Sequence, residues 1–567
     1  MRMRTGGVVV REWLESSGID HFFHVPGETF LPILDALLDS SVTLVTCRHE
    51  SGASFAAAAY ARHGRRLGVC MGTRGPGASN LTIGLHTAMY EALPLVVLLG
   101  QVPTTVLDSG AFQEVDLKFL YAPVSKQVFY VAEAESLPGV LRQAELTALT
   151  GRPGPVVVVL PQNLLGQAVA APMPPRAAVV TRGHVSATDV APVMNALASA
   201  ERPVVLSAVD WSDSEQRALA DVVSRLGLPV INAWRYYASF PNRHNNFCGN
   251  LGLGAPKAVD AALRAADVIV GLGQVLEDVN LGGGSKLGVD ADLTVVCPYT
   301  DAAGTRRTGS AAVRFFTVHP AAFVAGLGDW VLANPATAES LRQRFAGYTA
   351  TLHEATVSED VGVRESSPRS EDVGVRESSP RSDGVSPGVA MDDLFRSLEV
   401  AIPKNAVVSS DAGNFAQWLL RHLRFGERKF VGPVNGAMGY GLPGAIGVKL
   451  ADPSRAAWCI SGDGGFLMTA AELNTAVRLG LDLVCVVVNN GVYGTIRAHQ
   501  QRQFPGRPAG TDLGDVDYAA VARGMGWQAW TASTEDELEV ALRAVAETPG
   551  CRLIDARVQR DVLAIGE

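Results

Sequence analysis

The sequence predicts an α/β protein built from three doubly wound parallel-sheet domains, and two observations carry this prediction. Short apolar runs rich in Val, Leu and Ile alternate with Ala-rich amphipathic segments, as in strand–helix–strand units. The runs are apolar at successive positions, which is typical of strands that helices cover on both faces. A chain of 567 residues is also long enough for about three such domains. The predicted strands are Leu67–Thr73, Leu93–Gln101, Pro155–Pro161, Pro203–Ser207, Ala266–Gly273, Leu293–Tyr299, Ala456–Gly462, Leu481–Asn490 and Cys551–Val558.

Composition excludes several classes of protein. With 47% hydrophobic and 19% charged residues, the chain is neither disordered nor fibrous. Its net charge of −9 argues against nucleic-acid or anionic-membrane partners, which would select a basic surface. No apolar stretch approaches the about 18 residues of a membrane span, and Met1–Gly7 is too short and polar to open a signal peptide. The seven cysteines form no C-x-x-C pair, so we expect reduced thiols in a cytoplasmic protein.

Two changes in composition divide the chain. Residues 170–182 (AAPMPPRAAVVTR) are Pro-rich, and residues 357–388 are polar and rich in Ser and Pro. The second stretch contains a tandem repeat, SEDVGVRESSPR, at 358–369 and again at 370–381. Two polar copies without aromatic residues cannot form a solenoid core, so we favour a solvated linker over a binding module. The predicted domains are therefore 1–170, 188–335 and 389–567, with a flexible linker at 336–388.

The third predicted domain contains the most specific motif. Gly462-Asp463-Gly464-Gly465 follows one predicted strand, and Asn490 ends the next. Because carboxyl ends of neighbouring parallel strands meet at one edge of a sheet, Asp463 and Asn490 should converge there. A carboxylate and an amide oxygen form an incomplete ligand set that suits Mg²⁺, with phosphates and water completing the shell. Gly464 and Gly465 would let a diphosphate approach the first N–H groups of the next helix. A lone G-D-G often marks only a turn, but the added Asn pair favours a metal–diphosphate site.

This pattern resembles the thiamine diphosphate and Mg²⁺ binding motif, in which G-D-G is followed by a double Asn. The resemblance implies that Asp463, Asn490 and the backbone carbonyl of Val492 bind the metal ion. In the first domain, Arg48-His49-Glu50 precedes an Ala-rich helix and resembles the R-H-E segment of the acetolactate synthase branch. Glu50 is therefore implied to hydrogen-bond the pyrimidine of the cofactor and activate it. Without that resemblance, a Glu in the first turn of a helix would indicate only compensation of the helix dipole.

The resemblance to acetolactate synthases covers nearly the whole chain and is strongest in the two outer domains. In the third domain, Asp411–Asn414 resembles the loop at the diphosphate, and Gly436–Pro443 resembles the loop at the pyrimidine. The Gly436 carbonyl is implied to accept from the 4′-amino group. Met438 is implied to be the apolar wedge that bends the cofactor, with plain core filler as the alternative. The implied cofactor-binding residues are Gly413, Asn414, Gly436, Met438, Gly462, Asp463, Gly464, Gly465, Asn490 and Val492.

The residues expected to determine substrate specificity depart from the family pattern. Glu28 replaces a small residue of acetolactate synthases, and is either a second active-site carboxylate or only a helix N-terminal acid. Gln113 is implied to face the substrate, with a surface amide as the alternative. His499 replaces a Trp, and either titrates in the acceptor pocket or lies at the surface. The adjacent His pair of pyruvate decarboxylases has no counterpart in residues 102–116. The candidate catalytic residues are Glu50, Glu28, Gln113 and His499.

The central domain lacks flavin-binding features of acetolactate synthases. Those enzymes hold FAD there with a Gly-rich run after the first strand and an Arg in a G-x-R-F-D-D-like stretch. Here the first strand runs into Ser207-Ala208-Val209-Asp210, and the second stretch reads Gly273-Gln274-Val275-Leu276-Glu277-Asp278, without the Arg. The expected cofactors are therefore thiamine diphosphate and Mg²⁺, and we expect no functional FAD.

The resemblance implies a decarboxylating carboligase, which takes a 2-oxo acid and adds the remaining carbon unit to a carbonyl acceptor. A simple 2-oxo acid decarboxylase is the alternative, and a non-catalytic paralogue that binds thiamine diphosphate is a remote third. In the family Glu50 meets the cofactor of a neighbouring subunit, which implies a homodimer or homotetramer with active sites between subunits. Gly439–Gly444 also matches the dinucleotide fingerprint G-x-G-x-x-G. We reject a nicotinamide-dependent dehydrogenase because residues 432–438 (GPVNGAM) are not a strand.

Overall fold

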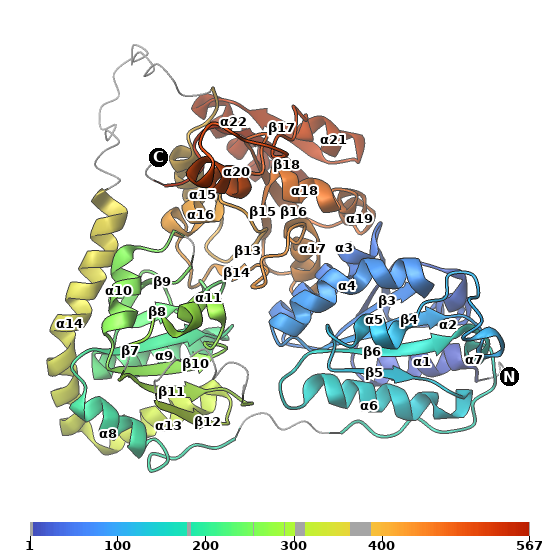
Figure 1. Ribbon diagram of the computed structural model, residues 1–567, viewed down its shortest axis with the longest axis horizontal. Helices are drawn as coiled ribbons and strands as arrows, with labels where there is room; N and C mark the ends of the chain where they lie inside the picture. Colours follow the sequence, from blue (N-terminus) through green and yellow to red (C-terminus); the bar gives the residue numbers. More distant parts are fainter. Residues whose placement is uncertain are drawn as a thin grey trace.

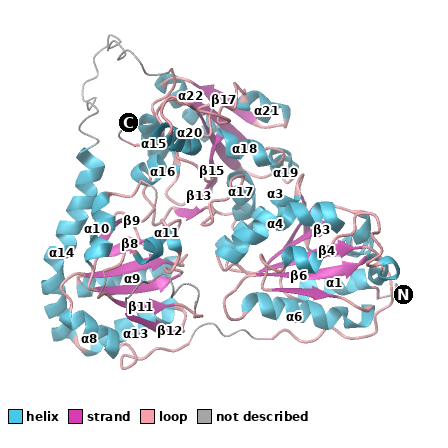
Figure 2. Cartoon of the chain, viewed as in Figure 1, coloured by secondary structure: helices cyan, strands magenta, loops and turns pink. Residues whose placement is uncertain are grey.

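The computed structural model describes residues 4–177, 183–252, 254–288, 290–300, 312–362 and 387–565. These residues form three domains, each with one six-stranded sheet whose strands all run parallel and whose faces carry helices (Figures 1 and 2). This confirms the predicted fold class. Each of the nine predicted strands coincides with an observed strand to within a few residues. The seven cysteines are buried and free.

The first sheet has the strand order β2-β1-β3-β4-β6-β5. Helix α3 (Glu50–Gly64) begins soon after β2, so Glu50 lies at the carboxyl edge of this sheet. The strands are β1 His21–His24, β2 Thr43–Thr46, β3 Gly68–Thr73, β4 Leu95–Gln101, β5 Gln127–Tyr130 and β6 Pro155–Pro161. The other α-helices are α1 Gly6–Ser16, α2 Leu31–Leu37, α4 Arg74–Tyr90, α5 Leu117–Tyr121, α6 Leu137–Leu149 and α7 Gln162–Leu165.

The second sheet has the strand order β12-β11-β10-β7-β8-β9. Its strands are β7 Pro203–Ala208, β8 Val230–Asn232, β9 Phe247–Asn250, β10 Val268–Gly273, β11 Asp292–Val296 and β12 Ala312–Phe316. Its helices are α8 Ala191–Ser199, α9 Asp213–Leu226, α10 Lys257–Ala265, α11 Asp278–Leu281, α13 Pro320–Ala333 and α14 Pro335–Gly362.

The third sheet has the strand order β14-β13-β15-β16-β18-β17. The chain leaves β13 toward one side of the sheet and returns through β15 on the other, so the topological switch point lies between these two strands. The strands are β13 Val407–Ser410, β14 Lys429–Val431, β15 Ala457–Gly462, β16 Leu483–Asn489, β17 Gln528–Ala532 and β18 Cys551–Arg557. The helices are α15 Met391–Ala401, α16 Ala416–His422, α17 Gly441–Ala451, α18 Asp463–Thr469, α19 Glu472–Arg478, α20 Gly494–Gln503, α21 Tyr518–Gly524 and α22 Glu535–Glu547.

The predicted flexible linker begins too early in the sequence. Residues 335–362 form helix α14, which runs along the outside of the second domain (Figure 1). The helix buries Leu341, Phe345 and Leu352 against that domain. These side chains recur at helical spacing, so burial of one apolar face stabilises the helix although most of its other side chains are polar. The remainder of the tandem repeat, from residue 363 to 381, lies outside the described residues.

The structure argues against the nicotinamide-dependent dehydrogenase, because no strand among the described residues leads directly into the glycine motif at 439–444. Strand β14 ends at Val431, and residues 432–438 form a loop before the glycine motif. A dinucleotide fingerprint requires a strand that leads directly into the glycines. The structure therefore confirms that this motif is not such a fingerprint.

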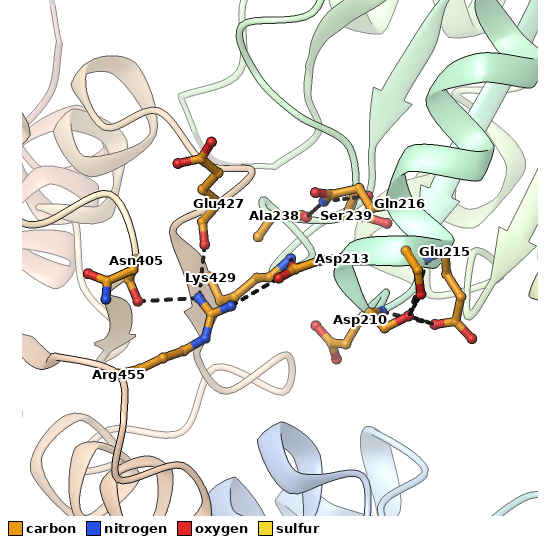
Figure 3. Close-up of polar contacts among 12 residues, drawn as sticks. Asp210, Asp213, Glu215, Gln216, Ala238, Ser239, Asn405, Glu427, Lys429 and Arg455 are labelled. Atoms are coloured by element: carbon orange, nitrogen blue, oxygen red, sulfur yellow. Dashed lines mark hydrogen bonds and ion pairs between the residues drawn. The ribbon is translucent and has the colours of Figure 1, made fainter.

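The three domains contact one another closely. Helix α3 of the first domain packs on α17 of the third, where a side chain at Gly447 would lie 2.1 Å from the Ala56 carbonyl oxygen. Between the second and third domains, the Asp213 carboxylate forms ion pairs with Lys429 Nζ at 2.8 Å and with Arg455 Nη2 at 3.4 Å (Figure 3). In the part of the chain that is described, no helix is both long and apolar enough to span a bilayer.

Candidate active site

A cavity of about 280 Å³ opens at the carboxyl edge of the third sheet. The loops after β13, β15 and β16 surround it, so it lies at the switch point where open α/β sheets bind ligands. All the residues predicted to bind the cofactor line this cavity: Gly413, Asn414, Gly436, Met438, Gly462, Asp463, Gly464, Gly465, Asn490 and Val492. The fold thus brings together residues that lie far apart in the sequence, whereas their roles as ligands stay predictions.

Asp463 presents a buried carboxylate to the cavity. Its two oxygens accept hydrogen bonds from the backbone N–H groups of Gly464 at 2.8 Å and Gly491 at 2.6 Å. Burial raises the pKa of Asp463 to about 6, although these N–H groups act in the opposite direction. The Asn490 side-chain oxygen lies at the neighbouring strand end and accepts from the Val492 N–H at 3.2 Å. A cation beside these oxygens would offset the cost of the buried negative charge.

The glycines beside Asp463 are required by close packing. A Cβ atom on Gly464 would lie 2.4 Å from the Tyr493 ring, and one on Gly465 would lie 2.4 Å from the Asp411 carboxylate. Because positions 464 and 465 carry no side chain, a diphosphate could approach the start of α18, where the Gly464 N–H already donates to Asp463. In the described part of the chain, no three His, Cys, Asp or Glu side chains gather closely enough to hold a metal ion. A cation in this cavity would thus depend on Asp463 together with amide, carbonyl and phosphate oxygens, which is the donor set that suits Mg²⁺.

Glu50 lies outside this cavity within one chain. It is half-buried in the first turn of α3, and its carboxylate accepts a hydrogen bond from the Asn80 side chain at 2.9 Å. A side chain at Gly77 would lie 3.0 Å from the same carboxylate. Glu50 is therefore fixed in position at the edge of the first domain, and a second subunit would have to bring it to a cofactor.

The other three candidate catalytic residues are exposed and do not line the cavity either. Glu28 lies beside a shallow surface pocket with Gln162. Gln113 has a φ angle of +64°, and its backbone carbonyl accepts from the Gly75 N–H at 2.8 Å. His499 lies on α20, where its ring nitrogen contacts Arg502 at 3.3 Å. Within one chain the structure does not bring these three residues together with the cavity.

The sequence reasoning missed several residues of the cavity. Trp234 and Arg235 reach it from the second domain, which the motifs did not connect with the cofactor. The signal available was the Trp-Arg pair that begins two residues after the end of β8, at the carboxyl edge of the second sheet. Phe415 and Ile496 add apolar surface from the third domain.

A further missed residue, Glu472, ties the third domain to the segment that carries Glu50. The buried carboxylate of Glu472 accepts hydrogen bonds from the backbone N–H groups of Arg48 and His49, each at 3.0 Å. A Cβ atom on Gly52 would lie 2.3 Å from this carboxylate, so the two segments meet without a gap. Burial raises the pKa of Glu472. The position of Glu50 thus depends on a helix of another domain.

Replacing Glu472 with alanine should destabilise the protein. The substitution leaves two backbone N–H groups without an acceptor, which costs about 2–4 kcal/mol and lowers the melting temperature by several degrees. Glu472→Gln keeps one acceptor oxygen, so its melting temperature should fall less than that of Glu472→Ala. Calorimetry checks this order, with Glu547→Ala, an exposed position at the end of α22, as the control. Equal melting temperatures for Glu472→Ala and the control would contradict the role given to Glu472.

Comparison with known proteins places the chain in a family. The family model "Thiamine pyrophosphate enzyme, N-terminal TPP binding domain" matches residues 4–120, and the central-domain model of the same family matches residues 190–315. The model "Thiamine pyrophosphate enzyme, C-terminal TPP binding domain" matches residues 411–556, which include the cavity loops. Thiamine pyrophosphate is another name for thiamine diphosphate.

Individual proteins agree with these matches over nearly the whole chain. The acetolactate synthase isozyme 2 large subunit of Escherichia coli K12 is 29% identical, over 96% of this chain and 94% of its own. The acetolactate synthase large subunit of Parasynechococcus marenigrum WH8102 is also 29% identical, over 98% and 88%. A Rhodococcus jostii RHA1 thiamine diphosphate-dependent 4-hydroxybenzoylformate decarboxylase shares the fold, with a TM-score of 0.78 at 22% identity, over 98% and 99% of the two chains. The chain therefore belongs to the thiamine pyrophosphate enzyme family, in which it resembles the large subunits of acetolactate synthases.

Proposed function

We propose that the protein is a thiamine diphosphate- and Mg²⁺-dependent carboligase that decarboxylates a 2-oxo acid and joins the remaining carbon unit to a carbonyl acceptor. The observation that carries this proposal is the cavity at the switch point of the third sheet, where Asp463, Asn490 and the glycine cradle form one surface. The acetolactate synthase relatives favour ligation as the outcome.

The residues present fit the cofactor. Asp463, Asn490 and the Val492 carbonyl would hold Mg²⁺, and Gly464 and Gly465 would let the diphosphate approach the start of α18. When bound, thiamine diphosphate supplies an electron sink for the carbon–carbon bond that breaks. Phe415, Met438 and the other apolar residues of the cavity would exclude water, which favours loss of the charge of the substrate carboxylate.

Glu50 would complete the site from a second subunit. The protein would then be a homodimer or homotetramer with active sites between subunits. Several large apolar side chains of the two outer domains are exposed in one chain, among them Phe112 at 78% and Met468 at 51%. Exposed apolar surface of this kind is typical of a face that another subunit covers. The roles of Glu28, Gln113 and His499 in substrate recognition stay predictions that depend on this pairing.

A simple 2-oxo acid decarboxylase is the second candidate function. One solved structure that shares the fold is a decarboxylase by name, and Glu28 offers an exposed carboxyl group that could deliver a proton. In this alternative the carbon atom that loses CO₂ would gain a proton and would not add to a second carbonyl compound.

Product analysis separates these functions. Purified protein is incubated with pyruvate, thiamine diphosphate and Mg²⁺, and the products are identified by mass spectrometry. Acetolactate or acetoin supports ligation, whereas acetaldehyde alone supports simple decarboxylation. A protein that binds the cofactor but releases no CO₂ from a panel of 2-oxo acids would be the non-catalytic paralogue. The absorbance spectrum of the same preparation checks the prediction of no functional FAD.

A further inference from the structure

The cavity contains one buried arginine from the second domain. Arg235 follows β8 and lines the cavity beside Trp234, and it is 1% exposed. Among the described lining residues, the side chains that carry a full charge are Arg235 and Asp463. Arg235 is therefore the cationic side chain of a cavity that the proposed function fills with an anionic cofactor.

Among the described residues, the hydrogen-bond partner of the Arg235 guanidinium group is neutral. Its Nη1 and Nη2 atoms donate to the Asp411 backbone carbonyl at 3.2 and 3.3 Å. Its Nε atom has no hydrogen-bond partner among the described residues. The group also lies over the rings of Trp234 and Phe430, 4.9 and 6.0 Å from their centres. Aromatic rings stabilise a cation but do not neutralise its charge.

The neighbouring Arg62 is also buried, but unlike Arg235 it has carboxylate partners. Its guanidinium pairs with Glu91 at 3.1 Å and with Asp210 at 2.9 Å. Within the described residues, Arg235 makes no such ion pair. The carboxylates of Asp411 and Glu91 attract Arg235 electrostatically without forming an ion pair with it. Since a buried cation without an ion-pair partner is costly, the difference indicates that an anion from outside the chain pairs with Arg235.

The surrounding residues hold Arg235 in place in spite of backbone strain. Its φ angle is +63°, in the left-handed region that side chains other than glycine seldom adopt. Arg62 donates to its backbone carbonyl at 3.1 Å. Gly432 leaves room for the guanidinium, because a Cβ atom there would lie 2.9 Å from Nη1. Such strain is typical of functional sites, where neighbouring contacts keep one side chain in a required position.

We propose that Arg235 binds the diphosphate of the cofactor, an inference that rests on the proposed function. Arg235 contacts the carbonyl of Asp411, which begins the 411–414 loop predicted to lie at the diphosphate. Asp463 faces the same cavity and is predicted to bind Mg²⁺. A diphosphate ester carries more negative charge than one Mg²⁺ neutralises when a carboxylate shares that metal ion. The guanidinium supplies the missing positive charge, and its planar N–H groups suit phosphate oxygens.

Binding measurements test this without relying on activity. Apo Arg235→Met and Arg235→Lys are titrated with thiamine diphosphate, thiamine monophosphate and thiamine at saturating Mg²⁺, by calorimetry or by tryptophan fluorescence. Arg235→Met should lower the affinity for thiamine diphosphate about 10- to 100-fold. The affinity for the monophosphate should fall less, and the affinity for thiamine should hardly change. Arg235→Lys should lie between wild type and Arg235→Met, because lysine keeps the charge but loses the planar geometry. Arg217→Met, which removes an exposed arginine of the same domain, is the matched control.

Three outcomes would overturn the inference. Equal losses for thiamine and thiamine diphosphate would give Arg235 a packing role only. Unchanged affinity for thiamine diphosphate would exclude the contact. Unchanged cofactor affinity with a raised KM for the 2-oxo acid would place the substrate carboxylate at Arg235 instead. If circular dichroism shows that Arg235→Met is not folded, the same titrations are made with Arg235→Lys. Failure of the wild-type protein to bind thiamine diphosphate would reject the proposed function itself, and is thereby distinguished from failure of this inference.

Discussion

Replacing Glu50 with glutamine should abolish turnover and leave cofactor binding nearly unchanged. Glutamine has the same size and can keep the contact with Asn80, so α3 and its surroundings should stay intact. It cannot share a proton with the pyrimidine as a carboxyl group does, and losing such a proton-transfer group costs about 10²–10⁴-fold in rate. Calorimetric titration with thiamine diphosphate and a steady-state assay of CO₂ release measure the two effects on the same preparation.

Glu133→Gln is the matched control for this variant. Glu133 is an exposed glutamate of the same domain, so its replacement should alter neither binding nor rate. Full activity of Glu50→Gln would remove the assignment of Glu50. A monomer in sedimentation experiments, at concentrations where the wild type is active, would contradict the proposal that a second subunit supplies this carboxylate.

The fold was predictable because its signals are local and strong. A parallel strand covered on both faces must be apolar at every position, and runs such as Leu93–Gln101 and Pro155–Pro161 contain little else. The cofactor cavity was predictable for a related reason. Gly462–Gly465 and Asn490 follow adjacent parallel strands, so the topology fixes that they meet at one edge.

The contributions of other domains were not predictable from motifs. Arg235 reaches the cavity from the second sheet, and Glu472 reaches the first turn of α3 from the third domain. Both depend on how domains pack, which no local motif encodes. Helix α14 was missed for a different reason. The polar, repeated sequence after residue 357 is typical of a linker and adjoins the helix directly, although Leu341, Phe345 and Leu352 already have helical spacing.

The candidate substrate-recognising residues depend on information that one chain does not contain. Glu28, Gln113 and His499 are exposed here and belong to two different domains. If subunits pair as proposed, the first domain of one chain faces the cavity of the other, and residues exposed in a single chain become the walls of a site. The sequence can therefore nominate such residues, but only the assembly determines which of them meet.

The contribution of Asp463 to the stability of the ligand-free protein should fall as the pH rises through about 6. Burial raises the pKa of its carboxyl from the ordinary value of 3.8 to about 6, so between these values the folded state binds a proton that the unfolded state has released. Stability contributed by this proton is fully present below pH 3.8 and is lost as the pH rises through about 6. The loss is up to about 3 kcal/mol, because each pKa unit corresponds to about 1.4 kcal/mol.

Asp463→Asn should therefore lose this pH dependence in EDTA, because the amide stays neutral, although it offers one acceptor oxygen where the carboxylate uses two. Urea denaturation at pH 4 and at pH 8 measures the difference, with the exposed Asp515→Asn as the control. Adding Mg²⁺ and thiamine diphosphate should restore the stability of the wild type at pH 8 but not that of Asp463→Asn, since the amide is a much weaker ligand for Mg²⁺ than the carboxylate. Parallel pH profiles for the two proteins, or equal stabilisation by the ligands, would contradict this role for Asp463.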